Sequence, residues 1–120
     1  MNEFETMYAG VRNEEGCRVL RIITIHGLGE NKDQIETKYA KLPLYLDEVN
    51  HSPTGFEWGY CGSGPSQLAF AILYDFTGDV DFSRSCYKQF KIDYISKFNQ
   101  DEWSLDSDEL YTIVEILKRG

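Results

Sequence analysis

The chain has 120 residues, of which 42% are hydrophobic and 14% aromatic, so it is long enough for one packed domain (1–120) and too apolar to be disordered. No apolar run approaches the roughly 20 residues that cross a bilayer, which argues against a membrane protein. A net charge of −8 repels nucleic acid phosphates, so the expected partners are basic protein surfaces and not nucleic acid itself.

The N-terminal third predicts β structure. Residues 7–12 form a short candidate strand, and residues 13–16 carry the chemistry of a hairpin turn. Residues 17–25 are rich in β-branched side chains and become apolar on both faces, which predicts a central strand covered on both sides. Residues 32–40 predict a helical turn, and residues 42–46 predict an edge strand, where a proline is tolerated.

The following segment predicts two helices. A run that begins at Pro65 is apolar nearly all round, which indicates a buried helix, and Gly78 is a natural end for it. Asp79 or Asp81 can cap a second helix over residues 82–98, where aromatic residues recur at intervals of three and four.

A last helix is predicted near the C-terminal end. Asp106 and Glu109 form a pair like a capping box, and the apolar residues after them share one face: Leu110, Ile113, Val114 and Leu117. Strands therefore precede helices along the chain. This order predicts an α+β fold, with a small N-terminal antiparallel sheet packed against three C-terminal helices, the first of them buried.

Residues 55–73, GFEWGYCGSGPSQLAFAIL, allow three interpretations, of which the first is a hydrolase with Cys61 as its nucleophile. Residues 22–29 would then supply the oxyanion loop. A nucleophile elbow needs glycine at position 63, where the chain has serine, and both histidines precede the cysteine. Neither histidine has a partner at metal-ligand spacing. We therefore expect no enzyme, no catalytic residue, no metal and no cofactor.

The second interpretation is an anion site at residues 62–65, GSGP, immediately before the buried helix. Pro65 suits the first helical position, and the free amides and the positive end of the helix dipole would face a phosphate. No Walker lysine follows. A nucleotide or phosphate bound here would contact these candidate ligand-binding residues: Trp58, Tyr60, Gly62, Ser63, Gly64, Ser66 and Gln67.

The third interpretation is architectural, and we favour it. Gly64 then caps the helix, Ser63 bonds an early amide, and Gly59 and Gly62 let the chain pass closely over neighbouring aromatic residues. Glycine at these positions serves the backbone geometry and not chemistry.

Charged and thiol side chains add three expectations. Glu57 lies between two aromatic residues, and a carboxylate there needs a partner that Arg12 or Arg21 can supply. The three cysteines are widely spaced, with no CxxC pair, which predicts reduced thiols. The acidic N-terminal residues differ from the basic start of an export signal, so we expect a cytoplasmic protein.

Residues 52–79, SPTGFEWGYCGSGPSQLAFAILYDFTGD, resemble the signature of a family of small uncharacterised domains that phages, plasmids and bacterial chromosomes carry. Members typically read SPTGFEWGYGGSGPAQLALAILLD. Their N-terminal Tyr-x-Gly-hydrophobic-Arg element is similar to residues 8–12. Cys61 stands where glycine is usual, so the resemblance implies no catalytic thiol. It implies a phage-like origin and leaves the activity open.

Acidic residues gather around the last predicted helix. The candidate partner-binding residues are Asp101, Glu102, Asp106, Asp108 and Glu109, with Glu115 nearby. Such a cluster can occupy a basic groove that normally holds DNA or RNA. Together with a phage-like origin, it predicts a non-enzymatic binding protein that inhibits a host factor such as a defence nuclease. The alternative is a protein that binds or sequesters a nucleotide or phosphate at the GSGP turn.

Overall fold

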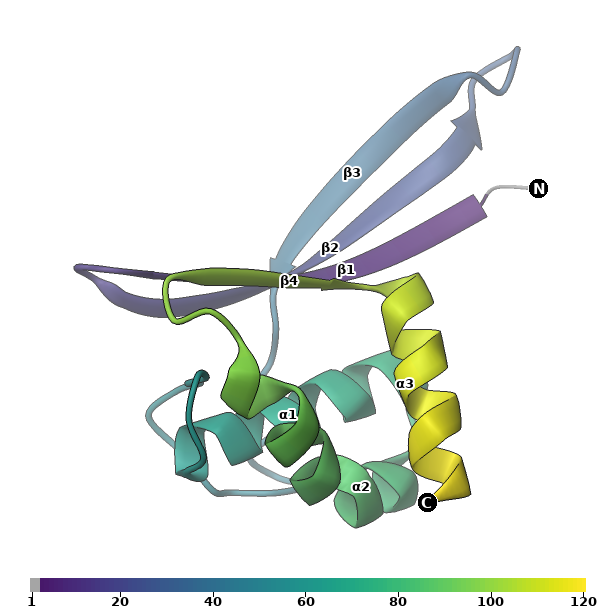
Figure 1. The fold of residues 1–120 in the computed structure, drawn as a ribbon. Coiled ribbons are helices and arrows are strands. Elements are labelled where there is room, and N and C mark those ends of the chain that lie inside the picture. The colour runs from purple at the N-terminus through teal and green to yellow at the C-terminus, as the bar shows by residue number, and fades with distance from the viewer. Residues whose placement is uncertain (1–2) are drawn as a thin grey trace.

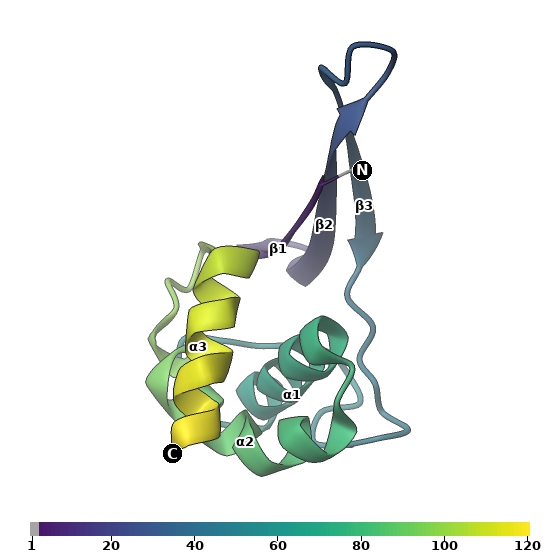
Figure 2. The same cartoon turned by 90° about the vertical axis from the view of Figure 1, so that its right-hand side faces the viewer.

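The computed structural model describes residues 3–120. In chain order the elements are β1 (Glu3–Asn13), β2 (Gly16–Leu28), β3 (Gln34–Lys41), α1 (Ser63–Thr77), α2 (Val80–Asp93), the short 3-10 helix η1 (Ile95–Lys97), β4 (Glu102–Asp106) and α3 (Ser107–Arg119). The strands form an antiparallel sheet in the order β3–β2–β1–β4. All three α-helices lie on the same side of this sheet (Figures 1 and 2), which confirms the predicted α+β class.

The β1–β2 hairpin turns where the sequence predicts it. Asn13 pairs with Gly16 across the turn, and the Asn13 side chain accepts a hydrogen bond of 2.9 Å from the Glu15 amide. Gly16 has a φ of 116°, a left-handed conformation that favours glycine. Both strands extend past the predicted limits of 7–12 and 17–25, because the ladder between them continues beyond those residues.

Two predictions after the hairpin are wrong. Residues 32–40 were predicted as a helical turn, but 34–40 belong to β3, because pairing with β2 holds this exposed segment extended. The edge strand predicted at 42–46 does not form, and the edge is β3 instead. The Leu42 amide still donates to the Val19 carbonyl at 3.1 Å, but Pro43 has no N–H with which to continue the ladder.

β2 is the predicted central strand, since it pairs with β1 on one side and with β3 on the other. The prediction that both of its faces are covered is wrong, because residues 22–28 are only half-buried. These residues lie beyond the helical layer, in a projection that we call the arm and define as residues 22–41 (Figures 1 and 2).

α1 is the buried helix that the sequence predicts, with ten consecutive buried residues, but its start differs. The helix begins at Ser63, so Pro65 occupies the third helical position and not the first. Gly62 is the N-cap and has no side chain to accept a cap bond, so the predicted capping by Ser63 and Gly64 is wrong. Gly78 ends the helix in the left-handed conformation, with a φ of 70°, as predicted.

α2 begins at the predicted cap but ends early. The Asp79 side chain accepts a hydrogen bond of 3.0 Å from an amide in the first turn. The single helix predicted over 82–98 is interrupted at Tyr94, and η1 follows. The Ile95 carbonyl there accepts a hydrogen bond from the Gly59 amide, which ties η1 to the segment before α1.

β4 lies between α2 and α3, where the sequence predicts only helices. Its side chains alternate, with Trp103 and Leu105 buried and their neighbours exposed. The indole of Trp103 covers Gly10 so closely that a Cβ at this position would overlap the ring. The capping box of Asp106 and Glu109 then starts α3 and is confirmed.

Candidate functional site

Trp58, a candidate ligand contact, is a core residue. Its side chain is 0% exposed, and its indole N–H donates to the Gln100 carbonyl at 3.0 Å. Its ring packs edge-to-face with that of Trp103, with 5.7 Å between the ring centroids. Tyr60, by contrast, is 47% exposed. The two aromatic residues therefore do not form one surface on which a ligand can lie.

Gln67, a second candidate, uses all its hydrogen-bonding groups within the protein. Its Oε1 accepts from the amides of His51 (2.7 Å) and Ser52 (3.2 Å). Its Nε2 donates to the carbonyls of Leu44 (2.6 Å) and Val49 (2.8 Å). This buried side chain thus fixes the loop before α1 to the helix, and it has no free donor for a phosphate.

The GSGP turn is partly covered by Glu57. A Cβ placed on Gly64 would lie 2.5 Å from the Glu57 Cβ, so glycine is required there for close packing. Gly64 and Ser66 are buried, whereas Ser63 is exposed and Gly62 half-buried. The structure therefore leaves only the start of this turn open to solvent, and phosphate binding stays a prediction.

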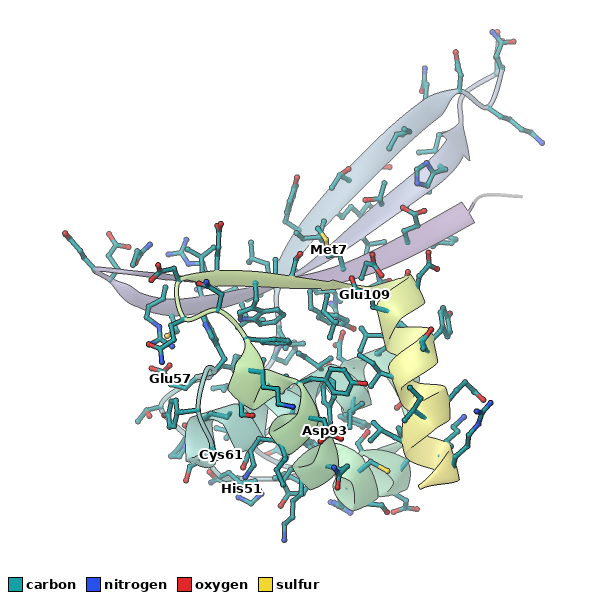
Figure 3. The ribbon with its side chains drawn as sticks, in the orientation of Figure 1. Met7, His51, Glu57, Cys61, Asp93 and Glu109 are labelled. Carbon is teal, nitrogen blue, oxygen red and sulfur yellow. The ribbon has the colours of Figure 1, made fainter. Side chains whose placement is uncertain are left out.

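Glu57 also makes the predicted ion pair. Its carboxylate lies 2.6 Å from Nη2 of Arg12, and this nitrogen also donates to the Trp58 carbonyl at 3.2 Å. The guanidinium carbon Cζ of Arg12 lies 5.2 Å from the centroid of the Trp58 ring. Burial, followed by a hydrogen bond to Glu57, raises the pKa of the nearby Cys17 thiol. Figure 3 shows Glu57 beneath the β1–β2 hairpin and Cys61 lower in the molecule. All three cysteines are free thiols, as predicted.

A buried cluster around Asp75 was missed by the sequence reasoning. The Asp75 carboxylate is 3% exposed and accepts from the Tyr8 hydroxyl (2.7 Å), the Arg21 guanidinium (2.5 Å) and the Tyr45 hydroxyl. Burial, and then the hydrogen bond to Asp75, raises the pKa of Tyr8 and raises that of Tyr45 to about 12. Both phenols therefore remain protonated donors at neutral pH.

The Asp75 cluster joins β1, β2, the loop before α1 and α1 itself, so its evident role is to hold the sheet on the helices. One signal in the sequence was available, since Asp75 is the lone carboxylate in an apolar helix and therefore needs partners. Those partners are 30 to 67 residues away along the chain. Local pattern alone did not indicate them.

Six exposed carboxylates lie on β4, on α3 and at the residue just before β4, and we call this set the acidic surface: Asp101, Glu102, Asp106, Asp108, Glu109 and Glu115. None of them takes part in an ion pair within residues 3–120. Asp106 and Glu109 have a second role, because the Glu109 amide donates to the Asp106 side chain at 2.8 Å to start α3. The other four carboxylates serve no such cap.

Glu5 of β1 extends the acidic surface, although the sequence analysis did not include it. A groove of about 240 Å³ lies between the strands and the start of α3, lined by Glu5, Thr6, Met7, Thr24, Asp106, Ser107 and Asp108. Met7 and Glu109 mark this junction in Figure 3. Pairing of Met7 with Asp106 brings the first strand beside the last, and no local pattern predicts this.

No three His, Cys, Asp or Glu side chains among residues 3–120 are arranged to hold a metal ion. No helix in the same range combines the length and the apolar character needed to cross a membrane. The charged and polar groups that the fold brings together are the Arg12–Glu57 pair, the Asp75 cluster and the acidic surface.

Comparison with known proteins identifies the family. A model described as a family of unknown function (DUF6166) matches residues 8–116. The chain belongs to this family. The match includes the Tyr-x-Gly-hydrophobic-Arg element, residues 52–79 and the whole acidic surface. No curated protein and no solved structure matches the chain.

Proposed function

We propose that this member of the family is a non-enzymatic binding protein of phage-like origin. Its acidic surface engages the basic groove of a host factor, such as a defence nuclease, and inhibits it. The observation that supports this most is that the six exposed carboxylates of the acidic surface have no cationic partner within residues 3–120. Charges without an internal partner are free to pair with the lysines and arginines of another protein.

The backbone under the acidic surface supports this role, because it is firmly held. Trp103 and Leu105 fix β4 to the core, and Leu110 does the same for α3 with 0% of its side chain exposed. Glu102 and Asp106 therefore project from one side of a strand at fixed positions. Preorganised charges lose little conformational entropy on binding and accelerate association with an oppositely charged partner.

The other polar clusters support a binding role over a catalytic one. The Asp75 carboxylate already accepts three hydrogen bonds, and its phenol partners hold their protons. Burial raises the pKa of the Cys17 and Cys86 thiols, so neither is an activated nucleophile.

The test is charge reversal on the acidic surface, assayed against a panel of purified bacterial defence nucleases. The variant is Glu102→Lys with Asp108→Lys, since neither side chain belongs to the capping box. The matched control is Glu14→Lys with Glu30→Lys, two exposed positions in the hairpin turns that change the net charge equally. We expect the wild type and the control to inhibit a nuclease, and the first variant to lose inhibition.

The salt dependence of binding provides a second measurement. Binding through the acidic surface weakens as the salt concentration rises. In the Glu102→Lys, Asp108→Lys variant, the affinity should depend less steeply on salt concentration. The proposal fails if no nuclease in the panel is inhibited, or if both double variants lose inhibition equally. The latter result would mean that total charge, and not this surface, determines binding.

A further inference from the structure

The two edge strands of the sheet, β4 and β3, differ in how well they are protected from pairing with a strand of another molecule. β4 has five residues, of which Glu102 and Asp106 are exposed acids, and it runs directly into α3. β3 has eight residues, all of them exposed, and is the outermost strand of the arm in Figures 1 and 2. A long exposed edge presents unpaired amides and carbonyls to another strand.

Hydrogen bonding at the base of β3 determines which backbone groups point outward. The Leu42 amide donates to the Val19 carbonyl of β2, so residue 42 faces inward. In an antiparallel ladder this direction alternates, so residues 40, 38 and 36 face β2 as well. The amides and carbonyls of Ile35, Thr37, Tyr39 and Lys41 therefore point away from the sheet.

We propose that β3 pairs antiparallel with β3 of a second copy of the chain, about a two-fold axis at Thr37. Thr37 then faces Thr37 of the other copy through outward-pointing backbone groups. Glu36 faces Lys38 of the other copy, and Asp33 faces Lys41. Because of the two-fold axis, each of these opposite-charge pairs occurs twice.

The apolar residues of β3 fit the same register. Ile35 and Tyr39, 62% and 67% exposed in the single chain, face each other across the new pair. A β-branched residue opposite an aromatic residue is a favourable cross-strand pair. One alignment thus matches both the charges and the apolar side chains.

Neighbouring registers are disfavoured by charge. An axis at Lys38 places this lysine opposite itself, and an axis at Glu36 does the same for the glutamate. If the axis lies between two residues, outward-facing residues are paired with inward-facing ones, and the hydrogen-bond ladder cannot form. β3 and the residue before it, 33–41, contain two acidic and two basic side chains, so this stretch is neutral although the chain carries −8. Two copies can therefore approach here without net repulsion between the edges.

The first experiment is sedimentation equilibrium of the wild type and two charge variants, from micromolar to hundreds of micromolar protein. The wild type is expected to be a dimer. Glu36→Lys places lysine against Lys38 of the other copy, and Lys38→Glu places two glutamates together, so each variant alone is a monomer. An equimolar mixture of the two restores opposite-charge pairs and forms a mixed dimer.

Thr37→Pro provides an independent test. It removes an outward-pointing amide that β2 does not use, so the monomer retains its fold, as circular dichroism and thermal unfolding can verify. This variant is expected to be a monomer. A monomeric wild type, or dimers that persist in Thr37→Pro and in the separate charge variants, would overturn the proposal.

Discussion

α1 and the arm differ in what holds their residues in place. α1 is buried over ten consecutive residues, and two of its polar side chains, Gln67 and Asp75, receive or donate hydrogen bonds from several directions. β3 in the arm is exposed throughout and, among residues 3–120, pairs with β2 alone. Side chains therefore determine the position of α1, whereas backbone hydrogen bonds determine that of β3. Substitutions in α1 should change stability, and those in β3 should change association.

The largest effect is expected at Asp75. Asp75→Ala leaves the Arg21 guanidinium and two phenols without their shared acceptor, and removal of one partner from a buried pair costs roughly 3–5 kcal/mol. Urea unfolding measures this loss. Asp93→Ala is the matched control, because Asp93 is exposed and should change the free energy of unfolding by less than about 0.5 kcal/mol. Equal effects in both variants would contradict the role assigned to the cluster.

A smaller effect is expected in the pH dependence. The folded pKa of Tyr45 is raised to about 12 from an ordinary 10.0, by burial first and by Asp75 second. A raised pKa means that the protonated phenol stabilises the fold. This contribution is complete below pH 10 and is lost as the pH rises to 12.

Equilibrium unfolding between pH 8 and 12 tests this sign. The wild type should lose stability across the alkaline range, and Tyr45→Phe should lose less because it has no phenol to titrate. Identical slopes for the two proteins would show that Tyr45 is not coupled to folding. The pKa of Tyr8 is raised in the same direction, and Tyr8 is present in both proteins, so it contributes to the loss of stability of each.

The smallest effect on stability is expected in the arm. Tyr39→Ser removes an aromatic ring that is already 67% exposed, so the unfolding free energy of the monomer should change by no more than about 0.5 kcal/mol. The proposed pairing of β3 should weaken in the same variant, because Ile35 loses its cross-strand partner. Thermal unfolding at low concentration and sedimentation at high concentration separate the two effects. A large loss of monomer stability would show that the arm is packed more firmly than its exposure indicates.

Local signals in the sequence predicted local structure well. The turn at Gly16, the helix end at Gly78 and the capping box of Asp106 with Glu109 each depend on residues only a few positions apart. The Arg12–Glu57 pair was also predicted, as one of two possibilities, because a carboxylate between aromatic residues needs a cation.

Features that depend on distant pairing were not predicted. β3 places Ile35, Thr37 and Tyr39 on one face, but neither face is buried and its polar residues outnumber the apolar ones, so this short alternation was not recognised as a strand. β4 does alternate, but over only five residues between two helices. The partners of Asp75, and Glu5 beside the acidic surface, come together only when the sheet forms.

The positions of β3 and β4 on opposite edges of the sheet have a consequence for valency. Two chains joined at β3 form a continuous sheet of eight strands, four from each copy, with an acidic surface at either end. Seven spacings of about 4.8 Å separate the two β4 strands by roughly 34 Å along the sheet. A partner with two basic sites at that spacing would be held at both, and the avidity could exceed the single-site affinity by roughly 10²–10⁴-fold.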